Sequence, residues 1–290
     1  MSPETPIGGL PAVFTKMSGA GNDFLVFDGR VPVGPREAES IRRLCRRGTG
    51  VGADGVLFVS SSVTADGRAI VELDYYNADG GPARFCANGT RCAARFAARR
   101  AGLEAGPLVV RTGWGEIPAA VLPGGSVTLS LPEPVAVLRD VPTFDPEGRS
   151  LEPAAAYVLV GVPHLVAFTQ DGVEVETLDV AALGPPLRRH PELPDGANVN
   201  LVTVRGGSRL SVRSFERGVE AETLSCGSGV VAAAVVAGLR RGLTAPVSVA
   251  TRSGSVLAVD FRIDGSLGKD VTLTGDARVV FEGSLTKEAL

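Results

Sequence analysis

The chain has 290 residues, of which 44% are hydrophobic and 21% charged, and it carries a formal net charge of −3 at pH 7. This length predicts two domains of ordinary size, each able to bury its own core. The slightly acidic balance gives no electrostatic reason to expect nucleic acid or an anionic membrane as a partner.

The first ten residues, the longest apolar run and the cysteine count predict the cellular compartment. Residues 1–10 lack the basic region and apolar stretch of a signal peptide. The longest apolar run, Val230–Leu239, is about half of what a membrane-spanning helix needs. Four cysteines in a chain of this length do not form a disulfide framework. We therefore expect a cytoplasmic protein with reduced thiols.

Most of the chain is predicted as short strands separated by Gly, Pro and Asp turns. Examples of the predicted strands, in chain order, are Phe24–Asp28, Val56–Val59, Ala69–Tyr76, Val127–Leu131, Tyr157–Val160, Leu165–Thr169, Val199–Val204, Arg209–Phe215, Val256–Phe261 and Val271–Leu273. The stretches Val141–Pro153 and Gly184–Gly196 are predicted as irregular connectors without counterparts elsewhere in the chain.

Three helices are predicted, at Arg36–Arg47, Gly89–Ala101 and Ser228–Arg241. The last two end alike, with a pair of arginines followed by a glycine that stops the helix. Ala, Val and Phe occupy several of their faces, so we expect these two helices to be buried. The patterns together predict an α+β fold in which a β-barrel-like sheet wraps around a central helix, twice.

The duplication is visible in the cysteine motifs. Cys86-Ala87-Asn88-Gly89 recurs as Cys226-Gly227-Ser228-Gly229, at an offset of 226 − 86 = 140 residues. Gly21–Val26 aligns with Gly161–Val166 at the same offset, and Thr112–Ile117 aligns with Thr251–Val256 one residue out of phase. We therefore predict two pseudo-symmetric half-repeat domains, one of residues 11–131 with a C-terminal return of 277–290, the other of residues 132–276.

Each predicted half places one cysteine at the start of a helix. Backbone N–H groups and the positive end of the helix dipole favour a thiolate there, and the same N–H groups can hold a carboxylate. Two such helix starts would hold an amino acid with its Cα between Cys86 and Cys226. One thiolate would then remove the α-proton while the opposite thiol delivers a proton to the other face. Cys45 and Cys92 have no duplicated partner and are predicted as core residues.

A set of motifs, spread over about residues 12–285, resembles the diaminopimelate epimerase family. The motifs are Met17–Phe24, Tyr76–Gly80, Cys86–Cys92, Pro163-His164, Asn198, Phe215–Gly218 and Glu222–Gly229. The resemblance implies a cofactor-independent isomerase that interconverts LL- and meso-diaminopimelate in lysine and peptidoglycan precursor biosynthesis. It also implies a homodimer and a site in the cleft between two barrel-like domains.

The resemblance assigns roles to particular residues. Cys86 and Cys226 match the catalytic pair, and His164 and Glu216 match residues that tune their protonation. The positions that match substrate-binding residues are Asn22, Asn77, Ala87, Asn88, Asn198, Arg217, Gly227 and Ser228. Departures from the family pattern include Gly55 in place of a frequent Gln and Val162 in place of a frequent Asn. These two positions leave recognition of the far end of the substrate less specified.

The residues give little support to a cofactor or a metal. Pyridoxal phosphate needs a Schiff-base lysine, and the three lysines are not in a helix-start or phosphate-loop context. The only two histidines are 26 residues apart, which is not a metal-ligand spacing. Gly50–Gly55 fits G-x-G-x-x-G but leads into an apolar strand pattern rather than a helix. We expect no cofactor, no metal and no nucleic-acid or membrane partner.

Two alternatives stay open on the sequence alone. One is a cofactor-independent racemase of another amino acid, suggested by Gly55 and Val162. The other, from a different class, is a redox switch or binding protein in which the paired thiols form a disulfide.

Overall fold

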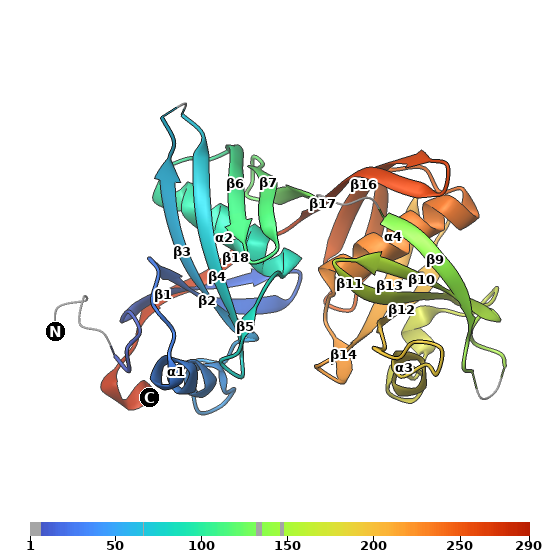
Figure 1. Cartoon of the computed structure of the whole chain (residues 1–290), viewed down its shortest axis with the longest axis horizontal. Coiled ribbons are helices and arrows are strands. Elements are labelled where there is room, and N and C mark those ends of the chain that lie inside the picture. Colours follow the sequence, from blue (N-terminus) through green and yellow to red (C-terminus); the bar gives the residue numbers. More distant parts are fainter. Residues whose placement is uncertain (1–6, 66, 132–134, 146–147) are drawn as a thin grey trace. The chain divides into compact units, whose positions relative to one another are not determined.

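The structure is a computed structural model, and it describes residues 7–65, 67–131, 135–145 and 148–290. It divides into two compact units, the first made of residues 1–129 and 275–290 and the second of residues 130–274 (Figure 1).

The first unit is built on one continuous run of paired strands. In the order in which they pair, these are β18 (Arg278–Ser284), β1 (Val13–Gly19), β2 (Asn22–Asp28), β3 (Gly55–Val63), β4 (Ala69–Asn77), β6 (Gly106–Thr112), β7 (Gly115–Val121) and β8 (Val127–Ser130). The β2–β3 and β4–β6 pairs are parallel and the others antiparallel. The short strand β5 (Pro82–Ala83) pairs with the end of β4.

Helix α2 (Ala87–Arg100) lies inside this run of strands and contacts β1, β2, β3, β4, β6 and β7. Most of its residues are buried, as its Ala-rich sequence predicts. Helix α1 (Pro35–Cys45) instead covers the other face of the strands, where Ile41 and Leu44 pack against Leu25 and Phe58. A 3-10 turn, η2 (Lys287–Ala289), ends the chain.

The second unit closes into a barrel. Its strands pair in the order β9 (Val135–Pro142), β10 (Ala154–Val160), β11 (Val162–Phe168), β12 (Asn198–Val204), β13 (Arg209–Glu216), β15 (Val247–Thr251), β16 (Val256–Asp264) and β17 (Leu267–Gly275). Leu267 and Gly268 of β17 pair with β9, so the described strands form a closed ring. Helix α4 (Gly227–Arg241) is buried within it and β14 (Ala221–Thr223) pairs with the end of β13.

The two units repeat one topology. The second unit's parallel pairs, β11–β12 and β13–β15, occupy the same places in the order as β2–β3 and β4–β6. The two central helices begin at Ala87 and Gly227, which preserves the offset of 140 residues read from the sequence (227 − 87). The predicted α+β fold, with a sheet wrapped twice around a buried helix, is confirmed.

One predicted connector was wrong. Residues 184–188 of the stretch predicted as irregular belong to helix α3 (Val180–Arg188), which follows the 3-10 turn η1 (Val175–Thr177). The helix contains Pro185 and Pro186, which normally disfavour a helix interior, so local propensity argues against it. It also has a counterpart, because α3 connects β11 to β12 as α1 connects β2 to β3.

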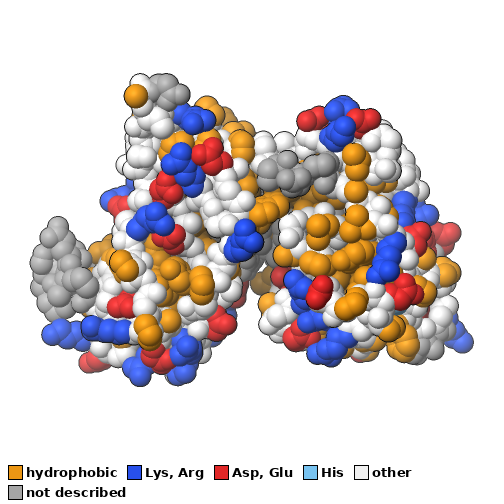
Figure 2. All heavy atoms as spheres, viewed as in Figure 1, with side chains coloured by type: hydrophobic (Ala, Val, Ile, Leu, Met, Phe, Trp, Pro, Cys, Tyr) orange, Lys and Arg blue, Asp and Glu red, His pale blue; other side chains and the backbone are white. Residues whose placement is uncertain are grey.

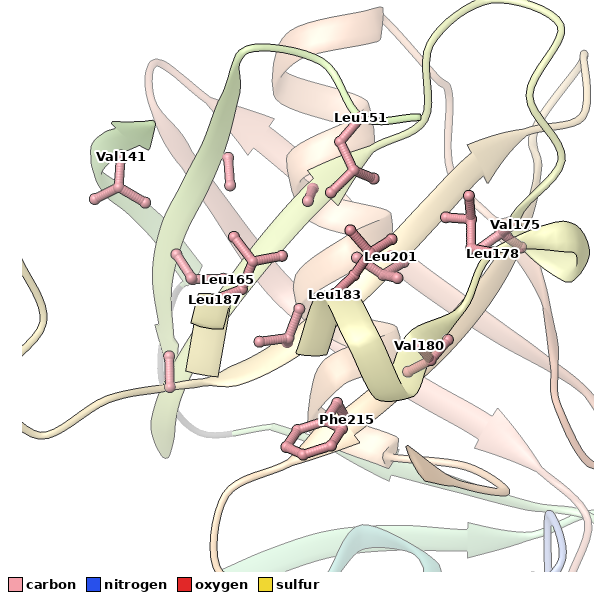
Figure 3. Close-up of a cluster of buried hydrophobic side chains, with 14 of the residues drawn as sticks. Val141, Leu151, Leu165, Val175, Leu178, Val180, Leu183, Leu187, Leu201 and Phe215 are labelled. Carbon is pink, nitrogen blue, oxygen red and sulfur yellow. The ribbon is translucent and has the colours of Figure 1, made fainter. Parts of the chain in front are cut away.

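Packing explains why α3 forms. Val180, Leu183 and Leu187 are buried in one hydrophobic cluster with Leu201 and Phe215 of the barrel (Figure 3). Burying these side chains offsets the local cost of the prolines, since each buried aliphatic side chain stabilises by about 1.5–3 kcal/mol. Asp179 caps the helix through a hydrogen bond from the Ala182 N–H at 3.1 Å.

Strands β11, β12 and β13 are largely buried on both faces, and this places polar residues against α4. Leu165, Leu201 and Phe215 face the α3 cluster. Side chains alternate along a strand, so their neighbours His164, Asn200 and Ser214 face the barrel interior. A Cβ built on Gly229 of α4 would lie only 2.1 Å from Asn200 Oδ1, which confirms that this face lies against the helix.

The charged side chains of one face are not gathered into patches of one sign. On the face shown in Figure 2, basic and acidic side chains are interspersed over both units, as the small net charge leads one to expect. Among the described residues, none of the helices combines the length and apolar character needed to cross a membrane.

Candidate functional site

The two cysteines of the repeated motif occupy the same place in their units. Cys86 is the N-cap of α2 and Cys226 is the N-cap of α4, and both have extended backbone dihedrals. The first intrahelical bonds run from Thr90 N to Cys86 O (2.8 Å) and from Val230 N to Cys226 O (2.9 Å). Ala87 and Gly227 are therefore the first helical residues, and N–H groups of these first turns have no acceptor within the helix.

In the first unit, two asparagines surround the Cys86 sulfur. Cys86 Sγ lies 3.5 Å from Asn22 Oδ1, and Asn88 Nδ2 lies 3.4 Å from the same oxygen. Asn22 comes from the start of β2, directly after a turn in which Ala20 (φ 52°) and Gly21 (φ 88°) are both left-handed. Such a two-residue turn fixes the register of β1 and β2 and therefore the place of Asn22 beside α2.

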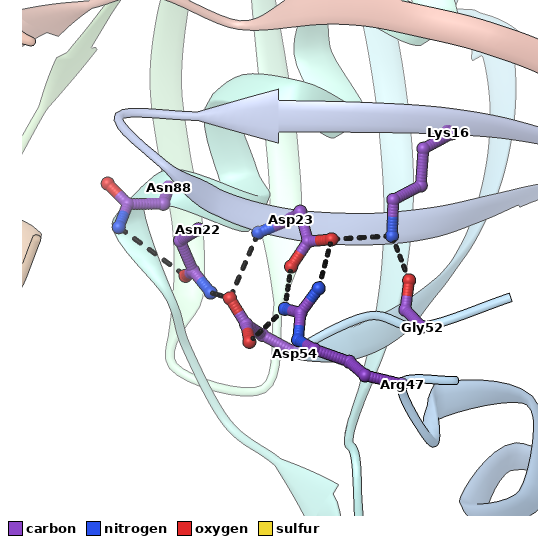
Figure 4. A network of polar contacts seen from close by, with 7 residues as sticks. All are labelled: Lys16, Asn22, Asp23, Arg47, Gly52, Asp54 and Asn88. Carbon is purple, nitrogen blue, oxygen red and sulfur yellow. Dashed lines mark hydrogen bonds and ion pairs between the residues drawn. The ribbon is translucent and has the colours of Figure 1, made fainter. Parts of the chain in front are cut away.

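A charged network holds the other end of the Asn22 amide (Figure 4). Asn22 Nδ2 donates to Asp54 Oδ2 at 2.7 Å, and Arg47 bridges Asp54 and Asp23. The Lys16 ammonium, which is buried, pairs with Asp23 at 2.6 Å and donates to the Gly52 carbonyl. Burial alone raises the pKa of Asp23, but the bonds from Arg47 and Lys16 outweigh burial and lower that pKa overall.

Asn88 is oriented by a buried arginine. Arg91 is fully buried in α2, and its Nη2 donates to Asn88 Oδ1 at 2.8 Å. Arg91 Nε also donates to the Asp276 carbonyl at 3.3 Å. Since a guanidinium only donates and a carboxylate only accepts, Arg91 and Asp54 fix both amides between them. Burial lowers the pKa of Arg91, and the neighbouring Cys92, Cys86 and Asp276 oppose this shift without reversing it.

Asn77 lies at the end of β4, opposite Gly55 of β3, and is exposed. Gly55 brings no side chain, and a Cβ there would approach the Tyr76 carbonyl oxygen to 2.6 Å. Gly55 is buried and pairs with Phe24 of β2, so this position has no room for a side chain.

In the second unit, the remaining predicted residues occupy adjacent strands. His164 of β11 pairs in register with Asn198 of β12, and Glu216 lies at the end of β13. The Arg217 N–H donates to Asn198 Oδ1 at 2.8 Å, while Arg217 Nη1 donates to the Asp195 carbonyl at 2.9 Å. Thr223 of β14 donates a hydrogen bond to Glu216. These contacts bring Asn198 and Arg217 together and hold Glu216 at the strand end.

At the start of α4, Cys226 Sγ lies 3.6 Å from Ser228 Oγ. Ser228 occupies the place that Asn88 has in α2, at the same offset of 140 residues (228 − 88), and both put a polar side chain beside the thiol.

Burial first, and the charge of Arg217 second, lower the pKa of His164 to about 3, so its ring is neutral at physiological pH.

Sequence reasoning missed the residues that orient the predicted ones. Asp54 and Asn200 carry no repeated motif, and their partners are distant in sequence. Arg91 lies within the Cys86–Cys92 motif and bonds Asn88 three residues before it. Arg91 alone left a signal, because an arginine in the middle of an otherwise apolar, buried helix needs an internal partner. Asn200 and Ser214 lie in strand patterns that read as fully buried, where a polar residue likewise needs one.

Cys45 and Cys92 lie in the core, as predicted. Burial raises the pKa of each thiol to about 12, so both remain protonated. Within the described ranges, no cluster of three or more His, Cys, Asp or Glu side chains is placed to hold a metal ion.

The fold of the chain is shared by several solved structures at low sequence identity. A phenazine biosynthesis protein of the PhzF family from Bacillus anthracis superposes with a TM-score of 0.67 at 15% identity, covering 95% of this chain and 99% of that one. A hydroxyproline epimerase from Agrobacterium vitis superposes with a TM-score of 0.60 at 16% identity, covering 94% and 92%. At these identities the likeness concerns the fold alone.

Sequence similarity is more specific. The family model described as diaminopimelate epimerase matches residues 14–136 and again residues 156–280. The diaminopimelate epimerase of Aquifex aeolicus is 38% identical, over 96% of this chain and 99% of that protein. The diaminopimelate epimerase of Archaeoglobus fulgidus is 36% identical, over 94% and 95%. With both repeats matched by the family model and relatives aligned end to end, this chain belongs to the diaminopimelate epimerase family.

Proposed function

We propose that the protein is an isomerase that interconverts LL- and meso-2,6-diaminopimelate at one Cα, with Cys86 and Cys226 as the two acid–base groups. The observation that carries the proposal is the repeated N-cap cysteine: each half of a duplicated fold presents one thiol at the start of its buried helix. Membership of the diaminopimelate epimerase family supplies the substrate.

The proposed step moves one proton in and one proton out. The thiolate of one cysteine takes the α-proton, so a Cα–H bond breaks and an S–H bond forms. The thiol of the other cysteine protonates the opposite face, so its S–H bond breaks and a new Cα–H bond forms. The product has inverted configuration at this carbon, and the two sulfurs have exchanged protonation states.

The helix starts are proposed to stabilise the intermediate. N–H groups at Ala87–Asn88 and Gly227–Ser228 would bind the α-carboxylate, onto which negative charge moves as the α-proton leaves. The remaining substrate contacts are proposed for Asn22, Asn77, Asn198 and Arg217. Arg217 is suited to the distal carboxylate because a guanidinium binds a carboxylate with two parallel hydrogen bonds. The roles proposed for His164 and Glu216 are to set the charge state of the thiols.

The test is α-proton exchange. The reduced protein is incubated with LL-diaminopimelate in deuterated water, and deuterium at Cα and the ratio of stereoisomers are followed. We expect exchange and formation of both isomers by the unmodified protein. Cys86→Ala and Cys226→Ala should each abolish isomer formation, because each removes one of the two proton-transfer groups.

Cys92→Ala is the matched control, since this thiol is buried and protonated. It should keep its turnover. Full activity in either N-cap variant would refute the two-thiol assignment, and absence of exchange by the unmodified reduced protein would refute the function.

The two relatives described above are diaminopimelate epimerases, and they align with nearly the whole chain. They therefore do not favour a racemase of another amino acid. A panel of monocarboxylic amino acids in the same assay checks this. Preferential turnover of one of them would replace diaminopimelate as the substrate.

Three further proposals concern the setting of the reaction. We propose a role in lysine and peptidoglycan precursor synthesis, a cytoplasmic location and a homodimer. The family supports the first, and a cysteine content that does not form a disulfide framework fits the reducing compartment proposed in the second. The homodimer rests on the family resemblance alone, and sedimentation equilibrium of the purified protein tests it.

A further inference from the structure

Three polar side chains form a hydrogen-bonded row beneath the start of α4. They are His164 of β11, Asn200 of β12 and Ser214 of β13, and all three are buried. Ser214 Oγ lies 2.9 Å from Asn200 Oδ1. Asn200 Nδ2 lies 3.2 Å from His164 Nδ1 and 3.1 Å from the Leu165 carbonyl oxygen.

The row has only one consistent direction of donation. The Leu165 carbonyl can only accept, so the amide nitrogen of Asn200 must face it. The same nitrogen then donates to His164 Nδ1, and the amide oxygen accepts from Ser214. Because Nδ1 accepts, the single proton of the neutral imidazole is on Nε2.

His164 Nε2 is buried, and among the described residues it has no hydrogen-bond partner. An N–H group buried in this way destabilises the structure until an acceptor reaches it. The second unit thus contains a donor whose direction is set by the row and whose acceptor is not supplied by the described protein.

The equivalent positions of the first unit are apolar or aromatic. The strand registers match Phe24 to His164, Leu57 to Asn200 and Tyr75 to Ser214. Phe24 and Tyr75 make an edge-on ring contact at 5.9 Å. A Cβ on Gly89 of α2 would meet Leu57 and Phe24, just as one on Gly229 would meet Asn200. Two halves with one topology therefore differ at the three positions that support the helix start.

We propose that Asn200 and Ser214 are positioning residues that hold His164 in its neutral Nε2–H tautomer, so that it presents one N–H donor to an anionic oxygen or sulfur at the start of α4. The identity of that acceptor, a substrate carboxylate or a thiolate, rests on the proposed function. The tautomer and its cause do not. Burial of His164, and the charge of Arg217 beside it, keep the ring neutral.

The tautomer is measured directly by ¹⁵N NMR of the full chain. The sequence has two histidines, and His190→Gln assigns the spectrum. We expect His164 to show an unprotonated Nδ1 and a protonated Nε2 at neutral pH. A proton on Nδ1, or a doubly protonated ring, would overturn the proposal.

Two variants test the cause. Ser214→Ala removes the donor to Asn200 Oδ1 and should shift the His164 ring resonances while lowering turnover between about twofold and tenfold. Ser211→Ala is the matched control, because Ser211 is buried on the same strand and contacts Arg205 instead. It should change neither readout. Equal effects of the two substitutions on both readouts would refute the positioning role.

Asn200→Asp is the stronger change. A carboxylate has no N–H to donate, so it should draw the His164 proton to Nδ1 and lower turnover roughly ten- to hundredfold. An unchanged Nε2–H tautomer in a folded Asn200→Asp protein would overturn the proposal. If the unmodified protein shows the Nε2–H tautomer but no α-proton exchange, the row is as proposed and only the function fails.

Discussion

The orientation of the Asn22 side-chain amide is set by its hydrogen-bond partners. Its oxygen faces the Cys86 sulfur because its nitrogen is held by the Asp54 carboxylate. Rotating the amide by half a turn would bring two acceptors together at Asp54 and expose an N–H to Asn88, which is itself oriented by Arg91. Arg91 and Asp54 thus decide that the amide oxygen of Asn22, and not its nitrogen, faces the Cys86 sulfur.

Asp54→Ala should therefore lower kcat/KM about tenfold to a hundredfold, because the loss of a hydrogen bond to a charged group costs about 1.5–3 kcal/mol. Steady-state isomerisation kinetics measure this. Asp74→Ala serves as the control, since Asp74 forms its ion pair with Arg30, an exposed residue of the same unit. An Asp54→Ala protein with the kinetics of its control would show that the Asn22 amide needs no external support.

His164 also makes stability depend on pH. Its pKa is lowered by burial from 6.5 to about 3 in the folded protein, so the unfolded chain binds the extra proton more readily. The stability that comes with a neutral, buried His164 is fully present above pH 6.5 and is lost as the pH falls toward 3. Urea denaturation should show the free energy of unfolding decreasing over this interval. In His164→Phe, which copies Phe24 of the other unit, this part of the decrease should vanish; an identical pH dependence would contradict the assignment.

At the scale of elements, the two central helices begin in the same way but rest on different surfaces. Gly89 of α2 and Gly229 of α4 occupy equivalent positions. A Cβ on Gly89 would lie 3.3 Å from the flexible end of Leu57, whereas one on Gly229 would lie 2.1 Å from Asn200 Oδ1. Helix α4 can thus approach β12 this closely only because residue 229 is a glycine and has no side chain.

Gly89→Ala and Gly229→Ala should consequently have opposite effects on stability. Alanine is favoured over glycine in a helix by about 1 kcal/mol, so Gly89→Ala should be neutral or slightly stabilising. Gly229→Ala must displace Asn200 and should destabilise by about 1–3 kcal/mol. Thermal or urea denaturation of the two variants measures the difference in stability. Equal stabilities would mean that Asn200 can move away from α4 without destabilising the fold.

Helix α3 shows the limit of local patterns at the same scale. Pro185 and Pro186 in its sequence predict a break, yet Val180, Leu183 and Leu187 lie at helical spacing and complete the cluster over Leu201. Burial against the barrel outweighs propensity, which is a weak local preference.

At the scale of the whole molecule, the chain crosses from one unit to the other and returns. The second unit is continuous, residues 130–274, and its described strands close a barrel. The first unit needs its last strand, β18, from residues 278–284, and β18 pairs along β1. The two halves of one duplication therefore differ in their dependence on the C-terminus.

We expect the fragment 130–274 to fold alone and unfold cooperatively. The fragment 1–129 lacks β18, which leaves β1 as an unpaired edge, and it should unfold at lower temperature or aggregate. Circular dichroism melting of the two fragments measures this, with a 1–129 fragment fused to residues 275–290 as the control. A fragment 1–129 as stable as the fused control would show that β18 is dispensable.

The amino-acid sequence by itself determined the duplication, the buried helices, many of the strands and the two cysteines at the helix starts, while β1, β6, β7, β15 and β18 were not predicted. These features are written in local periodicity and in a motif that repeats at a fixed offset, so they can be read without knowing which strands pair. Tertiary structure alone decided the rest: that Asp54 holds Asn22, and that Asn200 and Ser214 lie beside His164 under the start of α4. The physical reason is that a buried polar group takes whichever partner the strand register brings to it, and most of these partners are distant in sequence.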